Sequence, residues 1–274
     1  MPELPEIETI CRGLKSQILN LDIIKAKRQT NLNLRQIIPE DIEQQLANKK
    51  IIDIERRAKY ILIHLNSSLS IIIHLGMSGK LLIREENYAY QKHDHFILYL
   101  NNGKKIIYND PRRFGLITTS DRTNLDKHPL FINLGIEPLS DNFNSHYLHS
   151  ILKSKKQPIK STIMDNKNLV GVGNIYALEA LFLSKILPTR ESNSLNQDEI
   201  SSLYENIIHV LKQAIKQGGS TIKDYSSISG ESGYFQHSFK VYNQEGKECK
   251  TCNQLILRIK QAGRSSFFCQ ECQK

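Results

Sequence analysis

Four of the five cysteines lie within the last 26 residues of this 274-residue chain, and their spacing constrains the fold more than any other feature. They form two Cys-x2-Cys pairs, Cys249 with Cys252 and Cys269 with Cys272, separated by sixteen residues. Each pair can turn tightly and present two sulfurs to one tetrahedral ion. The spacing predicts one structural Zn2+, with redox disulfides as the remaining alternative. Four thiolates leave no open position for water, so a catalytic metal is not expected.

The hairpin between the two pairs is too small to fold by core burial alone, so metal binding must supply its folding energy. It carries the basic residues Arg258, Lys260 and Arg264. Basic side chains on a metal-stiffened hairpin suit phosphate binding. An ordinary solvated face would have the same composition, and the hairpin alone does not decide between the two.

The charge balance narrows the class of partner. The chain has 37 Lys and Arg against 28 Asp and Glu, a formal charge of +9, and a pI of about 9.2. Cations beside phosphates release condensed counterions, so this excess favours a polyanionic partner, although a merely basic protein would show the same balance. No apolar run approaches the ~20 residues of a membrane span, and the first residues do not resemble a secretory signal. We therefore expect no membrane association and a cytoplasmic location, where thiols stay reduced.

The first half of the chain has the pattern of a β-rich domain. Leu14 and Ile18 continue the apolar spacing of the opening residues, which predicts a helix beginning near Pro5. Asn66-Ser67-Ser68 and Asn102-Gly103 separate neighbouring apolar runs and predict hairpin turns. The expected strands are Ile51–Ile54, Ile61–Leu65, Ile71–Leu75, Phe96–Leu100 and Lys105–Tyr108. Residues up to about 130 are therefore expected to form a β-sandwich with helices at its edges.

After His128-Pro129 the pattern changes to helical periodicity. Asn196 to Asp198 offer a cap for the longest helix, and Gly218-Gly219-Ser220 ends it. The following Ser- and Gly-rich stretch predicts a loop. The expected helices lie near Tyr147–Leu152, Asn174–Leu183 and Asp198–Gln217.

Six short motifs, together with the zinc finger that contains Arg264, resemble the bacterial formamidopyrimidine-DNA glycosylase family over almost the whole chain. One motif would be weak evidence, whereas six in the family's order in both halves are specific. The related pyrimidine-directed glycosylases usually begin Pro-Glu-Gly-Pro, and Leu4 favours the purine-directed branch. The motifs are Met1-Pro2-Glu3-Leu4-Pro5-Glu6, Arg57-Ala58-Lys59-Tyr60, His74-Leu75-Gly76-Met77-Ser78-Gly79, Asp110-Pro111-Arg112-Arg113-Phe114-Gly115, Met164-Asp165-Asn166-Lys167 and Gly171-Val172-Gly173-Asn174-Ile175-Tyr176-Ala177.

The resemblance implies an α+β fold: an N-terminal β-sandwich with flanking helices and a C-terminal helix–two-turn–helix domain with a four-cysteine zinc finger. The expected parts are a catalytic domain over residues 1–130, a DNA-binding domain with a lesion loop over 131–238, and the zinc finger over 239–274. DNA is expected in the cleft between the two domains. The implied partner is duplex DNA containing oxidised purines, bound by a monomer.

The resemblance also implies the chemistry of the N-terminus. If Met1 is removed, Pro2 presents a secondary amine, and an α-amino group titrates near ~8, so a useful fraction is neutral. Such an amine can displace a damaged base from the sugar and form an imine, followed by β- and δ-elimination. Glu3 is implied as a general acid/base, and Glu6 as a residue that hydrogen-bonds near the N-terminus. Without the resemblance, both acids would simply favour a helix start.

The remaining implied site residues contact DNA. When a nucleotide is extruded from the duplex, the space that it leaves in the base stack would be occupied by Met77, Arg112 and Phe114. Taken singly, most of these residues have ordinary explanations: a strand-end cluster for Lys59, a core histidine for His74, core packing for Met77. Lys59 and Arg264 are implied as catalytic residues that also contact the DNA backbone. The other implied DNA contacts are His74, His93, Lys160, Asn174, Lys223 and Tyr242.

Two alternatives stay open from the sequence. One is an endonuclease VIII-like glycosylase for oxidised pyrimidines, which Leu4 and the Arg112-Arg113-Phe114 segment disfavour. The other is a non-catalytic, zinc-dependent DNA-binding protein in which Pro2 is blocked or unused.

Overall fold

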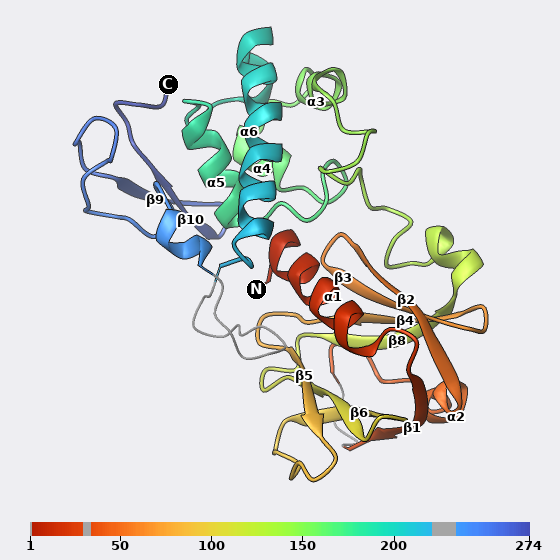
Figure 1. Cartoon of the computed structure of the whole chain (residues 1–274). Helices are drawn as coiled ribbons and strands as arrows, with labels where there is room; N and C mark the ends of the chain where they lie inside the picture. Colours follow the sequence, from red (N-terminus) through yellow and green to blue (C-terminus); the bar gives the residue numbers. More distant parts are fainter. Residues whose placement is uncertain (1, 30–33, 221–233) are drawn as a thin grey trace. The chain divides into compact units, whose positions relative to one another are not determined.

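The computed structural model describes residues 2–29, 34–220 and 234–274, and it divides into two compact units (Figure 1). The first unit contains residues 1–132 and the short return 218–233. The second contains residues 133–217 and 234–274. Within the described residues, no helix is long and apolar enough to cross a membrane.

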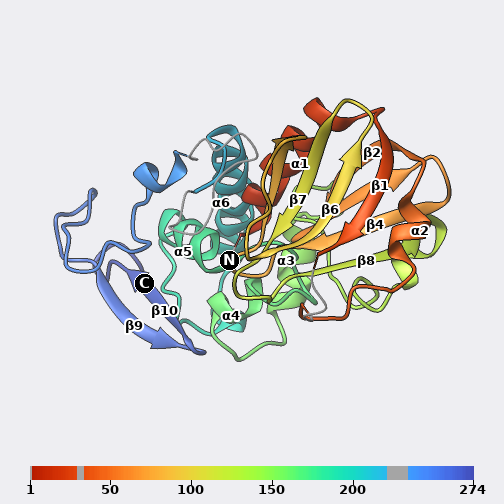
Figure 2. The ribbon, with the colours of Figure 1, turned by 90° about the horizontal axis from the view of Figure 1, so that it is seen from below.

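The first unit is built on an antiparallel sheet with strand order β5-β7-β6-β1-β2-β3-β4-β8. β1 and β2 pair through Asp22 with Lys50 and Ile23 with Lys49. The sheet bends at this short pairing, so that β1, β6 and β7 lie in one layer and β2, β4 and β8 in another (Figure 2). The strands are β1 (Asp22–Arg28), β2 (Lys49–Arg57), β3 (Tyr60–Leu65), β4 (Leu69–His74), β5 (Lys80–Glu85), β6 (Asp94–Leu100), β7 (Lys104–Asn109) and β8 (Leu116–Asp121).

Alternating side chains of both layers meet in one apolar core, as the period of a strand requires. Ile61 and Ile63 of β3 reach it from one layer, and Leu98 and Leu100 of β6 from the other. Helix α1 (Leu4–Ile18) adds its buried face and packs against β2, while the short α2 (Ile42–Leu46) packs against β1. A 3-10 turn, η1 (Arg122–Lys127), follows β8.

The second unit is helical, with a two-stranded hairpin near the C-terminus. Helix α5 (Asn174–Leu183) is buried along nearly all of its length, and α6 (Gln197–Lys216) packs against it with an apolar face. The hairpin of β9 (Leu257–Gln261) and β10 (Arg264–Phe268) packs against α5. The remaining elements are α3 (Ser145–Leu152), α4 (Ile159–Ile163), η2 (Ser192–Ser194) and η3 (Phe235–Ser238).

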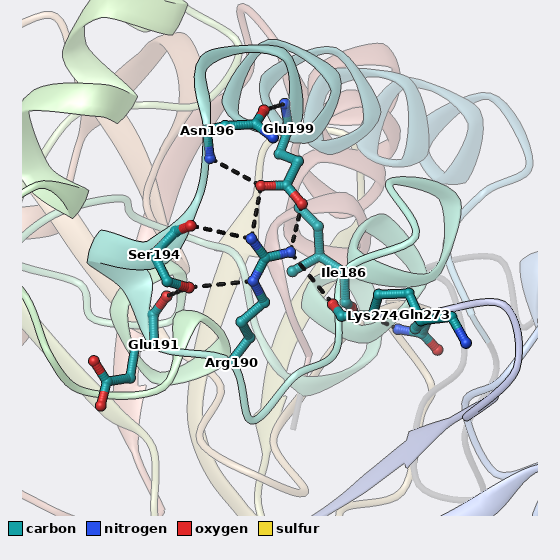
Figure 3. A network of polar contacts seen from close by, with 8 residues as sticks. All are labelled: Ile186, Arg190, Glu191, Ser194, Asn196, Glu199, Gln273 and Lys274. Carbon is teal, nitrogen blue, oxygen red and sulfur yellow. Dashed lines mark hydrogen bonds and ion pairs between the residues drawn. The ribbon is translucent and has the colours of Figure 1, made fainter.

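A polar network joins the start of α6 to the end of the chain (Figure 3). The Arg190 guanidinium bonds both oxygens of Glu199 and holds the pKa of that carboxyl below its usual value. Asn196 caps α6 by accepting the Glu199 backbone N–H at 3.0 Å, and Glu199 accepts the Asn196 N–H at 2.8 Å. Arg190 also reaches the Lys274 carbonyl at 3.4 Å. The network fixes the start of α6 against the last residue of the chain.

The fold class predicted from the sequence is confirmed. Both predicted hairpin turns are present, and Asn196 is the cap of α6 as expected. Helix α5 has the predicted bounds, and α1, α3 and α6 begin within two residues of the predicted positions. The sequence patterns did not predict β1, β5, β8, α2 or α4.

Candidate active site and DNA-binding residues

Pro2 and Glu3 are both buried and lead directly into α1. The Glu3 backbone N–H donates to Glu6 Oε2 at 2.8 Å, which is the hydrogen bond near the N-terminus expected of Glu6. Pro5 stands in the first turn of α1, where its missing N–H costs nothing. The local sequence therefore forms a rigid N-terminal segment at the positive end of a helix dipole.

The second oxygen of Glu6 binds a segment that is distant in the sequence. Ser220 donates to Glu6 Oε1 from its backbone N–H at 2.8 Å and from its hydroxyl at 3.0 Å. Gly219 has φ +79°, and a Cβ there would lie 2.9 Å from Glu6 Oε1. Glycine is therefore required both by the backbone conformation and by the close approach of the carboxylate. Lys223 and most of the expected lesion loop lie outside the described residues.

Lys59 and His74 lie side by side at the ends of neighbouring strands. Lys59 is buried in the tight turn between β2 and β3, after Ala58 with φ +54°, and His74 is paired with Tyr60 across β3 and β4. Burial, followed by the charges of Arg35 and Lys59, lowers the pKa of His74 to about 4. His74 Nδ1 accepts the Gly76 N–H at 3.0 Å. His74 is therefore neutral near pH 7 and carries its proton on Nε2, where it can donate to a phosphate oxygen.

Met77, Arg112 and Phe114 are presented by two loops that are in backbone contact. Met77 is 40% exposed and Phe114 49%, which is unusual for large apolar side chains. The Arg112 guanidinium lies over the Phe114 ring at 4.9 Å, a cation–π contact. Asp110 N–H donates to the His93 carbonyl at 3.0 Å, so His93 lies at the base of the same turn. The structure thus brings together four of the predicted DNA-contact residues.

In the second unit, three further predicted residues meet around the tip of the β9–β10 hairpin. Lys160 Nζ donates to Ser266 Oγ at 2.7 Å, and Asn174 Nδ2 donates to the Ser265 carbonyl at 3.0 Å. Asn174 is the first residue of α5, and the N-terminus of a helix favours an anion. Lys160 and Arg264 line a pocket of about 170 Å3. Two cations and a helix N-terminus form a site suited to phosphate.

Tyr242 lies at the start of the zinc-finger segment and is held from two sides. Its ring packs edge-on against Phe239 and Phe267, at 5.3 and 5.5 Å between centroids. Its N–H donates to Glu179 Oε1 at 2.8 Å, and the same carboxylate accepts the N–H groups of Lys240 and Val241. Burial raises the pKa of Glu179. Glu179 is a positioning residue that the sequence patterns did not indicate.

The four C-terminal cysteines converge as their spacing predicted, with all four sulfurs within 4.8 Å of one another. The Sγ atoms of Cys249 and Cys272 are 3.8 Å apart, and those of Cys252 and Cys269 are 3.4 Å apart. An edge of a zinc–thiolate tetrahedron with Zn–S of ~2.3 Å is about 3.8 Å, whereas a disulfide is only about 2.05 Å long. The four cysteines therefore fit one structural zinc and not two disulfides.

The first unit is a two-layered sheet with a buried Pro-Glu pair before its first helix. The second is a helical unit with cations around its hairpin tip and a four-thiolate zinc site. These features define a DNA glycosylase of the helix–two-turn–helix class. Three family models match successive stretches that cover most of the chain. The formamidopyrimidine-DNA glycosylase N-terminal domain matches residues 1–117, the H2TH domain of the same glycosylase matches 134–226, and the zinc finger found in FPG and IleRS matches 246–274.

Similar proteins point to the same family. The formamidopyrimidine-DNA glycosylase of Rickettsia bellii is 46% identical over 274 residues, which is all of both chains. The enzyme of Wolbachia pipientis subsp. Culex pipiens is 48% identical over 273 residues, again covering both chains fully. A mutant FPG of Lactococcus lactis in complex with Fapy-dG DNA superposes with a TM-score of 0.93 at 33% identity, covering all of both chains. MutM (FPG) from Thermus thermophilus gives a TM-score of 0.88 at 33% identity, covering 99% of this chain and 98% of that one.

The chain belongs to the formamidopyrimidine-DNA glycosylase family, whose members are DNA glycosylases with lyase activity at abasic sites and remove oxidised purines in base excision repair.

Proposed function

We propose that this chain removes 8-oxoguanine and formamidopyrimidines through an imine at Pro2, with Glu3 as the proton carrier. The buried Pro2-Glu3 pair at the start of α1 carries the proposal. A protonated amine is disfavoured at the positive end of a helix dipole, so the N-terminal amine would be kept neutral and nucleophilic once Met1 is removed.

The proposed steps use residues of this chain alone. The Pro2 nitrogen forms a bond to the anomeric carbon, the glycosidic bond breaks, and the base leaves with its electron pair and a proton. Ring opening then yields a positively charged imine, with Glu3 transferring the proton that the sugar oxygen needs. Removal of a proton from the neighbouring sugar carbon expels the 3′ phosphate, and a second elimination expels the 5′ phosphate.

The DNA contacts of this proposal divide into two groups. His74, Lys59, Lys160, Asn174, Tyr242 and Arg264 would bind the phosphate backbone, while Met77, Arg112 and Phe114 would occupy the stack. His93 and Lys223 complete the proposed set. We further propose a monomer acting in the cytoplasm at the nucleoid, and a three-part division of labour over residues 1–130, 131–238 and 239–274.

Borohydride trapping on a duplex carrying 8-oxoguanine opposite cytosine tests the nucleophile. The N-terminus is first checked by mass spectrometry, and the reduced adduct is then mapped by peptide digestion. We expect the adduct at Pro2, and Glu3→Gln should slow excision by about 100-fold or more, in the range of a lost general acid/base. Glu40→Gln, an exposed acid of the same unit, is the matched control.

Pro2→Gly tests whether the reaction needs the proline ring or only an N-terminal amine. It keeps an N-terminal amine, so trapping should continue at residue 2 at a lower rate. An adduct on an internal lysine such as Lys59 would overturn the proposal. Tight binding with no adduct, despite a free Pro2, would favour the non-catalytic DNA-binding alternative.

Lesion preference is the second test. A Lactococcus lactis Fpg structure has been solved with DNA containing an oxidised pyrimidine, at 32% identity and a TM-score of 0.92. Single-turnover excision on matched duplexes should favour 8-oxoguanine over oxidised pyrimidines for this chain. Trapping with the pyrimidine duplex alone would instead favour the endonuclease VIII-like alternative.

A further inference from the structure

We propose that the buried carboxylate of Asp110 is the positioning residue that couples the Met77 loop to the Arg112–Phe114 turn, so that both enter the duplex as one rigid unit. The inference rests on the proposed roles of these three side chains in base extrusion. Asp110 itself is fully buried and would not touch DNA.

Asp110 accepts hydrogen bonds from both loops. Oδ1 accepts the Ser78 hydroxyl at 2.6 Å and the Arg112 N–H at 3.2 Å. Oδ2 accepts the Gly115 N–H at 2.9 Å and the Tyr108 hydroxyl at 3.3 Å. Ser78 directly follows Met77, while Arg112 and Gly115 bracket the turn that carries Phe114. One carboxylate therefore anchors one end of the first loop and both ends of the second.

One further contact makes the anchor rigid. The Asp110 carbonyl accepts His95 Nε2–H at 2.9 Å, so the backbone of Asp110 is fixed as well as its side chain. Burial and the neighbouring Asp110 raise the pKa of Tyr108, so its phenol keeps the proton that it donates to the Asp110 carboxyl group.

The backbones of the two loops are also in direct contact. A Cβ built on Gly76, which has φ +61°, would lie 2.5 Å from the Phe114 carbonyl carbon and 2.6 Å from the Gly115 nitrogen. A Cβ on Gly115 would meet the Tyr108 hydroxyl at 1.8 Å. The loops therefore touch backbone to backbone, and Asp110 locks this arrangement from the buried side.

Such an anchor matters because unstacking a base costs a few kcal/mol. Met77 and Phe114 can offset that cost only if their positions are fixed before they enter the stack, since ordering them during insertion would add an entropic penalty. Loss of the anchor should therefore slow extrusion and leave the chemistry at the N-terminus unchanged.

Asp110→Asn is the first variant. An amide can accept at one position only, so the NH2 group would face either the Arg112 N–H or the Gly115 N–H, which cannot turn away. Excision of a paired 8-oxoguanine should slow by about 10- to 100-fold, the range for a hydrogen bond to a charged group. Ser78→Ala removes the hydrogen bond from the Met77 loop to Asp110 and one of the two acceptors of the Arg112 N–H, while the Asp110 carboxylate stays in place. It should slow excision by about threefold to tenfold. Asp126→Asn and Ser16→Ala, both exposed, are matched controls.

Two readouts separate this role from a general loss of structure. First, a lesion placed in a bulge is already unstacked, so both variants should excise it within about threefold of wild type. Second, Ser78→Ala should cost less in a Met77→Ala background than in wild type, because part of its effect acts through Met77. An equal loss on paired and bulged lesions, or full additivity with Met77→Ala, would overturn the inference. If Asp110→Asn does not fold by thermal melting, Ser78→Ala decides.

The inference can fail independently of the proposed function. Extrusion is followed by 2-aminopurine fluorescence beside a non-hydrolysable carbocyclic 8-oxoguanine paired with cytosine, which must be unstacked but needs no chemistry. Unchanged fluorescence kinetics in both variants would overturn the inference even if wild type forms the Pro2 adduct. Absence of that adduct in wild type would overturn the proposed function, whatever the fluorescence shows.

Discussion

Glu6, Asp110 and Glu179 are buried acids that hold other groups in place by hydrogen bonds. Glu6 and Glu179 accept backbone N–H groups from segments distant in the sequence, and Asp110 accepts the Gly115 N–H and the Ser78 hydroxyl. Buried charged groups are costly unless they are hydrogen-bonded in this way. In each case the acceptor fixes a segment that carries proposed site residues: the N-terminus, the Arg112–Phe114 turn and the Tyr242 segment. At the scale of single residues, the geometry of this enzyme is therefore set by acids that would not contact DNA.

The low pKa of His74 gives a prediction at this scale. The unfolded chain binds the proton near pH 6.5 and the folded chain only near about 4, so the unfolded state binds more protons between these values. Stability should fall as the pH drops from 6.5 toward 4, by roughly 1–3 kcal/mol from this residue.

Urea unfolding of wild type and His74→Gln across this pH range measures the effect. The variant should show a flatter dependence. His146→Gln, an exposed histidine of the other unit, should retain the wild-type slope. A His74→Gln profile parallel to wild type would show that His74 titrates normally.

The residues of the site fall into three groups by how well the sequence indicates them. The zinc cysteines were predictable because their spacing reflects local turn geometry. The Pro2 and Glu3 assignments came from resemblance, since a proline and an acid at a helix start are ordinary. Glu179 lies in an apolar helical run and Asp110 beside a proline, and neither carries a local signal of its distant donors.

At the scale of elements, the strands expected from sequence are mainly those buried on both faces. β3, β4 and β6 are nearly continuous apolar runs, and β7 contains the short apolar run Ile106-Ile107-Tyr108, which composition indicates directly. β5 and β8 are the edges of the sheet, and β1 is half exposed, so their sequences mix polar and apolar residues without a clear period. The short α2 and α4 contain too few turns for a helical period to be visible.

The cap of α6 gives a prediction for an element. Asn196→Ala removes the side-chain acceptor of the Glu199 N–H and should destabilise the second unit by about 1 kcal/mol. Chemical unfolding of the zinc-bound protein measures this. Asn193→Ala, whose exposed side chain lies just before the same helix, should be neutral, and an equal loss in both would show that the cap contributes nothing specific.

Glu179→Gln tests the link between α5 and the Tyr242 segment. Its amide nitrogen would face one of three backbone donors, which should cost about 1–3 kcal/mol. DNA binding should weaken along with stability, because Tyr242 is displaced. Glu205→Gln on the exposed face of α6 serves as the comparison, and wild-type affinity in Glu179→Gln would argue against this role.

At the scale of the whole molecule, the formal charge of +9 predicted a polyanionic partner. The chain belongs to a DNA-repair family, which agrees with that prediction. Composition predicted that the partner is negatively charged, but it did not indicate which Lys and Arg side chains would bind phosphate. That depends on tertiary contacts, such as those that place Lys160 and Arg264 around one pocket.

Salt dependence should identify these cations. The logarithm of the binding constant should fall linearly with the logarithm of salt concentration, and Arg264→Gln should reduce the slope by about one unit for one lost phosphate contact. Fluorescence anisotropy with a lesion duplex at several salt concentrations measures both slopes. Lys212→Gln on α6 should leave the slope unchanged. An unchanged slope in Arg264→Gln would assign Arg264 to a solvated face.

The hydrogen bonds between Glu6 and Ser220 join residues 214 positions apart. A chain made from its N-terminus can close the two-layered sheet once about half of it has been synthesised, since domains fold as they emerge. The partner of Glu6 does not yet exist at that moment, because α6 and the glycines after it are still to be translated. A nascent chain therefore passes through a stage in which the sheet can close while Glu6 still lacks Ser220. The contact that holds Glu6 forms only after α6 has been made.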